Sequence, residues 1–229
     1  MCGIFGFVSH NGHGPDLRRL EQIARATQRR GPHAFGFAWI DERGRLRMFK
    51  QTGRISDHLG LLAMAVDAKM LIGHCRYATH GSPDNNLNNH PHPVDGGWLV
   101  HNGVIHDVDR VIEENALHPV SECDSEVLGL LIEELDGSLV ERCIDAVHLA
   151  GDAPLAMAAV WRNPQRLVVV RSGNPLHFGE TPGGHYFGSL IGGLPRGSTM
   201  LRDNAALSFS IRKGQAKMVG FDASPAATY

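Results

Sequence analysis

The chain has 229 residues, of which 42% are hydrophobic and 20% are charged, and its formal net charge is −2 at pH 7. This balance excludes strong electrostatic attraction to nucleic acid or to an anionic membrane, and the hydrophobic content excludes an intrinsically disordered chain. No apolar run approaches the roughly 18 residues of a membrane span, and the first residues lack the pattern of a signal peptide. The four cysteines form no CxxC pair. We therefore expect a cytoplasmic protein with free thiols.

The first half of the chain combines apolar strand patterns with two helix patterns. Strands are expected at residues 1–9, 35–40, 46–51 and 70–77, the second and third forming a hairpin. A helix with one apolar face is expected at 16–29, where Gly31-Pro32 ends it. A second helix is expected at 56–69, with Ser56 as its N-cap. Residues 81–95 are rich in Asn and Pro and are expected to form a loop.

The second half begins with helix patterns and ends with strand patterns. Helices are expected at 108–116, 125–135 and 139–149. Strands are expected at 98–105, 155–161, 167–171, 185–190, 206–211 and 216–221. Residues 223–229 are expected to be a frayed tail, and no linker divides the chain, so a single domain over 1–229 is expected. Because strands and helices come in blocks and do not alternate strictly, an α+β fold is favoured over a doubly wound parallel sheet.

Cys2 combines two reactive groups if Met1 is removed, because it then becomes the first residue. The thiol would be a nucleophile, and the α-amine, which normally has a pKa of about 7.7–8.0, would be a base on the same residue. The alternative, which is the commoner one for a cysteine taken alone, is a small buried side chain in a strand. The sequence segments that follow Cys2 along the chain favour the reactive interpretation.

Six short segments follow one another along the chain. They are MCGI at 1–4, RGPHAFG at 30–36, GHCRYATHG at 73–81, HPHP at 90–93, HNGVI at 101–105 and DSEV at 124–127. In this order and spacing they resemble the glutaminase domain of the class II glutamine amidotransferases, the N-terminal-nucleophile hydrolase type found in glucosamine-6-phosphate synthase and amidophosphoribosyltransferase. The resemblance runs from Cys2 to at least Glu126 and continues weakly through 171–176. It implies a four-layer αββα sandwich, and no cofactor is expected.

The resemblance also implies a reaction in which Cys2 attacks the side-chain amide of glutamine. Ammonia leaves, and the resulting γ-glutamyl thioester is hydrolysed to glutamate. Asn102 and Gly103 match the oxyanion hole of the family, and their residue types suit it, since one offers a side-chain NH₂ and the other a backbone N–H without a Cβ. A plain Asn-Gly hairpin turn is the alternative for this pair.

Substrate selection requires a cation for the α-carboxylate of glutamine and an anion for its α-ammonium group. Arg76 and Asp124 match the family residues for these roles, and a guanidinium can hold a carboxylate by two parallel hydrogen bonds. Arg76 lies in a segment that otherwise reads as a buried strand, where a charge needs a partner. The pocket wall would be completed by Thr79, His80 and Gly81.

Three of these residues have structural alternatives that the sequence leaves open. Asp124 stands where an N-cap of the helix at 125–135 would stand, and both interpretations could hold together. Arg30 is expected to position the terminus, but it also suits a cation at the C-terminal end of a helix. His80 is as well suited to a structural hydrogen bond as to contact with the substrate.

The chain departs from the family pattern around these residues. His33 stands where an acidic residue is usual, Tyr77 where Trp is common, and Cys75 where Thr is usual. His106-Asp107 replaces the frequent Glu-Asn pair. None of these positions is the nucleophile, the oxyanion hole or the carboxylate clamp, so the departures concern the lid and the fine shape of the pocket.

Histidines are concentrated around the same motifs. Six of the 14 lie within 33 residues, at positions 74, 80, 90, 92, 101 and 106. Their spacing fits no helix-borne HxxxH or HExxH pattern, and four of them (80, 90, 92 and 101) lie in stretches that the family also fills with histidine without a metal. We therefore expect no metal site.

Three functions are compatible with these observations. The first is a glutaminase that passes ammonia to a separate synthase subunit, since the chain has no room for a synthase domain of its own. The second is a stand-alone amidohydrolase with an N-terminal cysteine, acting on another γ-glutamyl compound or small amide. The third is a non-catalytic regulatory module. The joint presence of Arg76 and Asp124, which suit a free amino-acid head group, favours the first.

Overall fold

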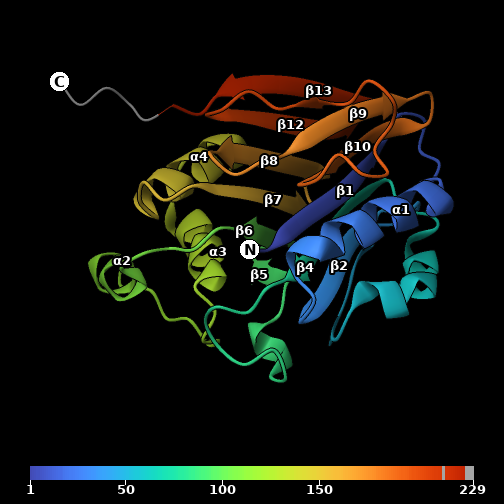
Figure 1. Ribbon diagram of the computed structural model, residues 1–229. Coiled ribbons are helices and arrows are strands. Elements are labelled where there is room, and N and C mark those ends of the chain that lie inside the picture. Colours follow the sequence, from blue (N-terminus) through green and yellow to red (C-terminus); the bar gives the residue numbers. More distant parts are fainter. Residues whose placement is uncertain (213–214, 225–229) are drawn as a thin grey trace.

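The computed structural model describes residues 1–212 and 215–224, which form two antiparallel sheets with helices on their outer sides (Figure 1). The strands of the first sheet are β1 (Gly3–Ser9), β2 (Ala34–Ile40), β3 (Leu46–Thr52), β4 (Met70–Arg76), β9 (His177–Thr181), β10 (Gly184–Gly188) and β11 (Thr199–Met200). Those of the second are β5 (His92–Val94), β6 (Gly97–Asn102), β7 (Leu155–Trp161), β8 (Arg166–Ser172), β12 (Ala205–Arg212) and β13 (Gln215–Asp222). The α-helices are α1 (Leu17–Thr27), α2 (Val108–Glu114), α3 (Ser125–Glu134) and α4 (Leu139–Leu149).

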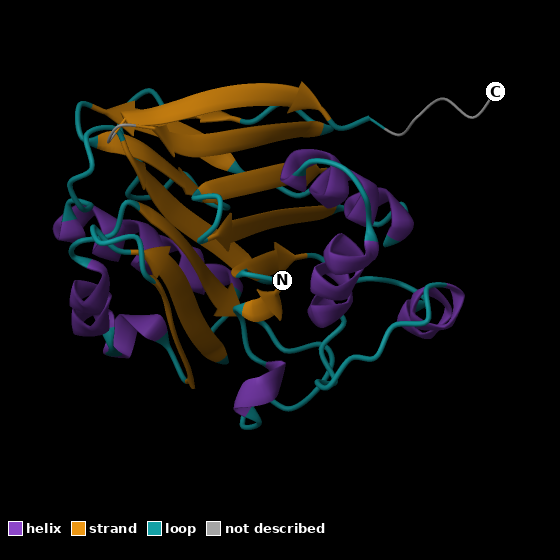
Figure 2. Ribbon diagram, turned by 180° about the vertical axis from the view of Figure 1, so that it is seen from behind, coloured by secondary structure: helices purple, strands orange, loops and turns teal. Residues whose placement is uncertain are grey.

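The strand order makes β1 the central strand of its sheet and places β6 next to the edge strand β5 of the other sheet. The seven-stranded sheet has the order β11-β9-β10-β1-β4-β2-β3, and the six-stranded sheet has the order β13-β12-β8-β7-β6-β5. The views from opposite sides show α1 against the first sheet and α3 and α4 against the second (Figures 1 and 2). The N-terminus lies where β1, β4 and β6 come together, so the layering brings Cys2 next to the end of a strand from the other sheet.

Three hydrophobic cores separate the four layers. In β1, Phe5 and Phe7 pack toward α1, whereas Ile4 and Val8 pack into the core between the sheets. The same alternation in β7 sends Met157 toward α3 and α4 and its neighbours toward the other sheet. Successive side chains of a strand point to opposite faces, so a strand buried on both faces reads as a continuous apolar run. The expected αββα sandwich and α+β class are therefore confirmed.

The predicted α-helix at 56–69 is wrong. The segment forms two 3₁₀-helices, Ile55–Asp57 and Leu59–Ala65, and Ser56 is not an N-cap. Its buried residues are Leu62, Ala65 and Ala68, whereas Val66 is 54% exposed. Burial at every third position is the period of a 3₁₀-helix, which has 3.0 residues per turn. An apolar pattern judged against 3.6 residues per turn therefore selected the wrong inward face.

Short elements inside the expected loops were also missed. The loop at 81–95 contains the 3₁₀-helix Asn86–Asn88 and the strand β5, and neither β9 nor β11 was predicted. The expected tail does not begin at Ala223, because this residue is buried and its N–H donates to the carbonyl of Asn204 at 2.9 Å. Residues 225–229 lie outside the described residues. Among the described helices, none has the length and apolarity needed to cross a bilayer.

Candidate functional site

A cavity of about 320 Å³ opens at the start of β1. Its lining includes Cys2, Thr79, Asn102, Gly103, His106 and Asn174. The pairing of β1 with β4 places Gly3 opposite Cys75, so Cys2 lies beside the end of β4. The cavity thus unites residues from the N-terminus just before β1, from the segment after β4 and from the end of β6, which are far apart in the sequence.

The Cys2 thiol is held against the backbone of Tyr77. The Tyr77 N–H donates to Sγ at 3.3 Å, and Sγ lies 3.5 Å from the Tyr77 carbonyl. Burial raises the pKa of the thiol, and the charge of Asp124 adds to this effect, while the Tyr77 N–H and the charge of Arg76 oppose it. Because the net shift is upward, the thiol is protonated at neutral pH and requires a base before it can attack.

Arg30 lies directly beside the same residue. Its Nε donates to the carbonyl of Cys2 at 2.6 Å, and Nη2 lies 3.4 Å from the Met1 sulfur. The side chain comes from the short 3₁₀-helix Gln28–Arg30 that follows α1. The guanidinium is therefore placed to hold the backbone of Cys2.

Asn102 and Gly103 lie where β6 ends. Asn102 is fully buried, and both polar atoms of its side-chain amide lack a hydrogen-bond partner. In the described part of the chain, no hydrogen bond has the Gly103 N–H as its donor. Buried polar groups are normally paired, so two free donors at one cavity are an arrangement that a ligand oxygen would complete.

The guanidinium of Arg76 is buried without a carboxylate partner among the described residues. Nη1 donates to Asn89 Oδ1 at 3.0 Å, and Nη2 donates to the carbonyl of Gly81 at 3.0 Å and to that of His80. All of these acceptors are neutral. A buried cation held only by neutral oxygens provides a site for an anion.

Asp124 is buried close to the same region. Its Oδ2 accepts from the N–H of Ile105 at 2.8 Å, and it makes no side-chain cap bond to α3, although it occupies the N-cap position. The other carboxylate oxygen, Oδ1, accepts from the hydroxyl of Ser125, the first residue of α3, at 3.4 Å. Asp124 and Arg76 both act on the pKa of Cys2, which places both charges near the thiol.

The three residues expected to form the pocket wall, Thr79, His80 and Gly81, are not all placed at the cavity. Thr79 lines the cavity with Cys2, whereas the side chain of His80 lines a neighbouring cavity of about 250 Å³ together with Asp124. Gly81 has φ +68°, and a Cβ there would come within 2.4 Å of Asn88 Nδ2. Gly81 lines neither cavity, and its left-handed backbone beside Asn88 depends on having no side chain.

Sequence reasoning did not assign Asn174 or His106 to the site, although both line the cavity. Asn174 belongs to the segment 171–176, where the family resemblance continues weakly, and this was the signal available. Two departures from the family pattern, His33 and Tyr77, contact each other with ring centroids 4.8 Å apart. His33 Nδ1 also accepts from the N–H of Ala78 at 3.0 Å, so this pair shapes the segment beside Cys2.

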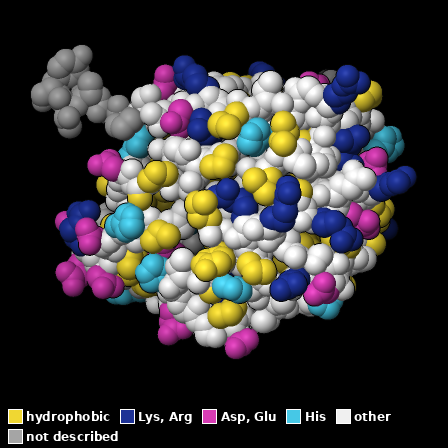
Figure 3. Space-filling model, viewed as in Figure 1, with side chains coloured by type: hydrophobic (Ala, Val, Ile, Leu, Met, Phe, Trp, Pro, Cys, Tyr) yellow, Lys and Arg dark blue, Asp and Glu magenta, His cyan; other side chains and the backbone are white. Residues whose placement is uncertain are grey.

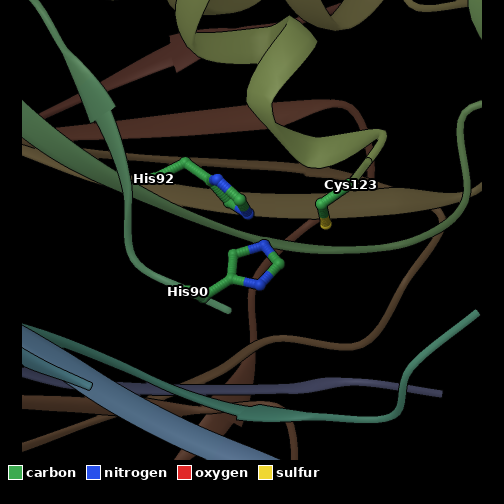
Figure 4. Close-up of side chains that lie close together, drawn as sticks. All are labelled: His90, His92 and Cys123. Atoms are coloured by element: carbon green, nitrogen blue, oxygen red, sulfur yellow. The ribbon is translucent and has the colours of Figure 1, made fainter. Parts of the chain in front are cut away.

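One group of residues near the site has the ligand types of a metal centre. The ligand atoms of His90, His92 and Cys123 lie within 4.8 Å of one another, and Figure 4 shows the two rings and the thiol converging. Burial lowers the pKa of both imidazoles, that of His92 to about 3, so the rings are neutral. The positive charges of Lys50 and Arg76 act on His92, however, and two fixed cations oppose a dication. We assign no metal to this group.

A second group lies at the far end of β1 from Cys2. His10, Glu180 and His185 have ligand atoms within 4.8 Å of one another, and His10 Nε2 lies 3.5 Å from Glu180 Oε1. Its distance from the cavity separates it from the candidate site. On the face that carries the N-terminus, acidic and basic side chains are interspersed with apolar ones (Figure 3).

Sequence comparison finds relatives among the glutamine–fructose-6-phosphate aminotransferases (isomerizing). That of Aquifex aeolicus is 36% identical over 202 residues, which are 83% of this chain and 33% of the relative. That of Corynebacterium efficiens is 31% identical over 209 residues, 85% of this chain and 33% of the relative. The chain spans about a third of the length of the curated relatives that it matches. No family model matches the chain.

Solved structures share the fold. The glutamine phosphoribosylpyrophosphate amidotransferase of B. subtilis, complexed with ADP and GMP, matches 98% of this chain and 50% of its own, with a TM-score of 0.75 and 22% identity. A glutamine aminotransferase class-II domain protein from Silicibacter pomeroyi matches 96% of this chain and 99% of its own, with a TM-score of 0.62 and 18% identity. Together with the sequence relatives, these matches show that the chain belongs to the class II glutamine amidotransferase family, with the N-terminal-nucleophile hydrolase fold.

Proposed function

We propose that the chain hydrolyses the side-chain amide of glutamine at Cys2 and supplies the ammonia to a separate synthase partner in the cytoplasm. The observation that carries this proposal is the meeting, in one cavity, of the Cys2 thiol with the free donors of Asn102 and Gly103. The relatives named above support glutamine as the substrate, because their names describe aminotransferases that use it.

The reaction requires a free α-amine on Cys2, so Met1 must be removed. The amine takes the thiol proton, Sγ attacks the side-chain carbonyl carbon of glutamine, and a tetrahedral oxyanion forms. The Asn102 side-chain NH₂ and the Gly103 N–H donate to this oxyanion. The ammonium then returns its proton to the leaving nitrogen, the C–N bond breaks, and ammonia departs. Water attacks the thioester in the same way and releases glutamate and the thiol.

The upward shift in the pKa of Cys2 makes the base necessary. A buried thiol that stays protonated at neutral pH is a weak nucleophile, and an amine titrating near neutrality on the same residue is well matched to it. Arg30 supports this geometry by holding the Cys2 carbonyl. Arg76 and Asp124 bind the carboxylate and the ammonium group of the substrate, and Thr79, His80 and Gly81 form the wall around them.

The test measures glutamate release from glutamine beside a panel of other γ-glutamyl amides. We expect glutamine to be preferred, Cys2→Ala to abolish release, and Cys143→Ala to retain it, because Cys143 is buried in α4 and does not line the cavity. Intact mass should show that the active protein has lost one methionine. Turnover of another amide with glutamine inert, in the presence of a synthase, would favour the stand-alone amidohydrolase. Normal turnover by a chain that retains Met1 would refute the proposed base.

A further inference from the structure

The side chain of Asn174 hydrogen-bonds to the backbone of Asn102, next to the proposed oxyanion hole. Its Nδ2 donates to the carbonyl of Asn102 at 2.8 Å and to the carbonyl of Pro154 at 2.9 Å. Both hydrogens of one amide are therefore used on two backbone oxygens, one at the end of β6 and one just before β7. The Asn102 carbonyl is the important one, because it belongs to the same peptide group as the Gly103 N–H.

Because a peptide group is rigid, a hydrogen bond to its carbonyl oxygen also fixes the direction of its N–H. The Asn102–Gly103 bond is trans, since the cis bonds among the described residues lie elsewhere, and a trans peptide is planar. Its C=O and N–H point in opposite directions. Fixing the Asn102 oxygen toward Asn174 therefore fixes the direction of the Gly103 N–H, which is left free beside the cavity.

Asn174 is itself held firmly by the loop that carries it. The guanidinium of Arg171 donates to the carbonyls of Asn174, Gly173 and Leu201, at 3.1, 3.2 and 2.8 Å. The Gly173 N–H donates to Asp203 Oδ1 at 2.7 Å, and Arg171 lies 3.6 Å from the same carboxylate. These hydrogen bonds fix the backbone of the loop at 172–174, so the side chain of Asn174 has a rigid base.

We infer that Asn174 is a positioning residue that orients the Gly103 N–H toward the developing oxyanion. This inference rests on the proposed function. It predicts an effect on the chemical step alone, because the Asn174 amide binds the carbonyl side of the Asn102–Gly103 peptide and does not contact Cys2. A merely structural role would instead change stability or the reactivity of the thiol.

The experiment compares Asn174→Ala and Asn174→Ser with Asn115→Ala in the mature enzyme. Asn115 is a matched control, because its Nδ2 also donates to a backbone carbonyl, that of Val111, but in α2. For Asn174→Ala we expect kcat for glutamine to fall by about 10- to 100-fold with little change in KM, since losing an oxyanion donor outright costs about 10²–10³. The kcat of Asn174→Ser, whose hydroxyl is a shorter donor, should lie between that of Asn174→Ala and that of the parent enzyme. Asn115→Ala should keep kcat.

Alkylation of Cys2 by iodoacetamide provides the second readout. This displacement develops no oxyanion, so its rate should be unchanged in both Asn174 variants. Unchanged kcat would overturn the inference, as would a parallel loss of kcat and alkylation rate. If neither Asn174 variant folds, the residue is a structural support and the inference is rejected. If the parent enzyme shows no glutamine hydrolysis after Met1 is removed, the proposed function is refuted. This outcome differs from failure of the inference, in which the parent enzyme is active and the Asn174 variants keep its kcat.

Discussion

Replacing Gly103 by alanine tests the oxyanion hole with the smallest change that the chain allows. A Cβ at this position would lie 2.6 Å from His101 Nε2, 2.8 Å from Leu155 Cβ and 3.0 Å from the Pro154 carbonyl oxygen. Ordinary contacts of a Cβ begin at about 3.4 Å, so something must move. No positive φ is involved at Gly103, and the conflict is one of space alone.

The neighbours of this Cβ are not free to yield. The His101 ring is fixed on its other side by Nδ1, 2.9 Å from Ser125 Oγ, and Leu155 is only 2% exposed. The Pro154 oxygen is held by Asn174. The peptide of Gly103 must therefore shift, and its N–H shifts with it. We expect a loss of about 1–3 kcal/mol of stability from overpacking. We also expect kcat to fall by at least about tenfold, toward the 10²–10³ of a lost oxyanion donor.

The assay combines urea denaturation with coupled detection of glutamate. Gly60→Ala is the matched control, since a Cβ there meets nothing within 4 Å, and the same substitution should be neutral or stabilising by about 0.4–1 kcal/mol. A Gly103→Ala enzyme that is destabilised as expected but keeps its kcat would show that the N–H does not bind the oxyanion. The reasoning about space fails if Gly103→Ala is as stable as the parent.

Three further predictions concern charge. Arg76→Lys should raise KM for glutamine by about 10- to 100-fold, because a single ammonium cannot replace a bidentate clamp, and steady-state kinetics would contradict this if KM stayed unchanged. In the chain that retains Met1, iodoacetamide alkylation of Cys2 should keep accelerating above pH 9.0, its ordinary thiol pKa, because burial raises the pKa; a plateau below that pH would refute the shift. Burial alone would raise the pKa of Asp41, but hydrogen bonds from Arg45 and Arg47 lower it to about 2. Its stabilisation should therefore be full above about pH 4 and lost as the pH falls toward 2, so the urea midpoints of the parent and Asp41→Asn should converge on acidification, and a constant difference would contradict this.

The layers of the fold could be predicted because both faces of the central strands are buried. A strand such as β1 is apolar from Gly3 to Val8, whichever face a residue occupies, and this is visible in the sequence. The helix type of the segment at 56–69 could not be predicted, because its buried positions 62, 65 and 68 follow a spacing of three and the expected cap, Ser56, lies inside a 3₁₀-helix. The short strands β9 and β11 were also missed, although β9 pairs with the next strand in the chain, β10. β11 has only two residues, and its pairing with β9 makes it a strand.

The chemical residues of the site could be predicted and the supporting ones could not. Cys2, Asn102 and Gly103 are set by residue type and order, and the structure brings them to one cavity. Asn174 has no chemical signature of its own, because its role depends on which backbone oxygens a folded chain places before it. The contact between His33 and Tyr77 could not be predicted either. Each residue taken alone only departs from the family pattern, and the folded structure is needed to show that the two rings pack together.

The energetics of two buried charges connect this fold to the proposed substrate. Arg76 and Asp124 are 2% and 5% exposed, both lie near Cys2, and they do not form an ion pair with each other in the described structure. Burial of opposite charges that remain apart costs stability, and a chain under selection for stability alone would pair them or replace them with apolar residues. A zwitterionic ligand that carries a carboxylate and an ammonium group on one carbon satisfies both at once. The same ligand needs a side chain that reaches the thiol, and the γ-carboxamide of glutamine would then meet Cys2 and the free donors of Asn102 and Gly103.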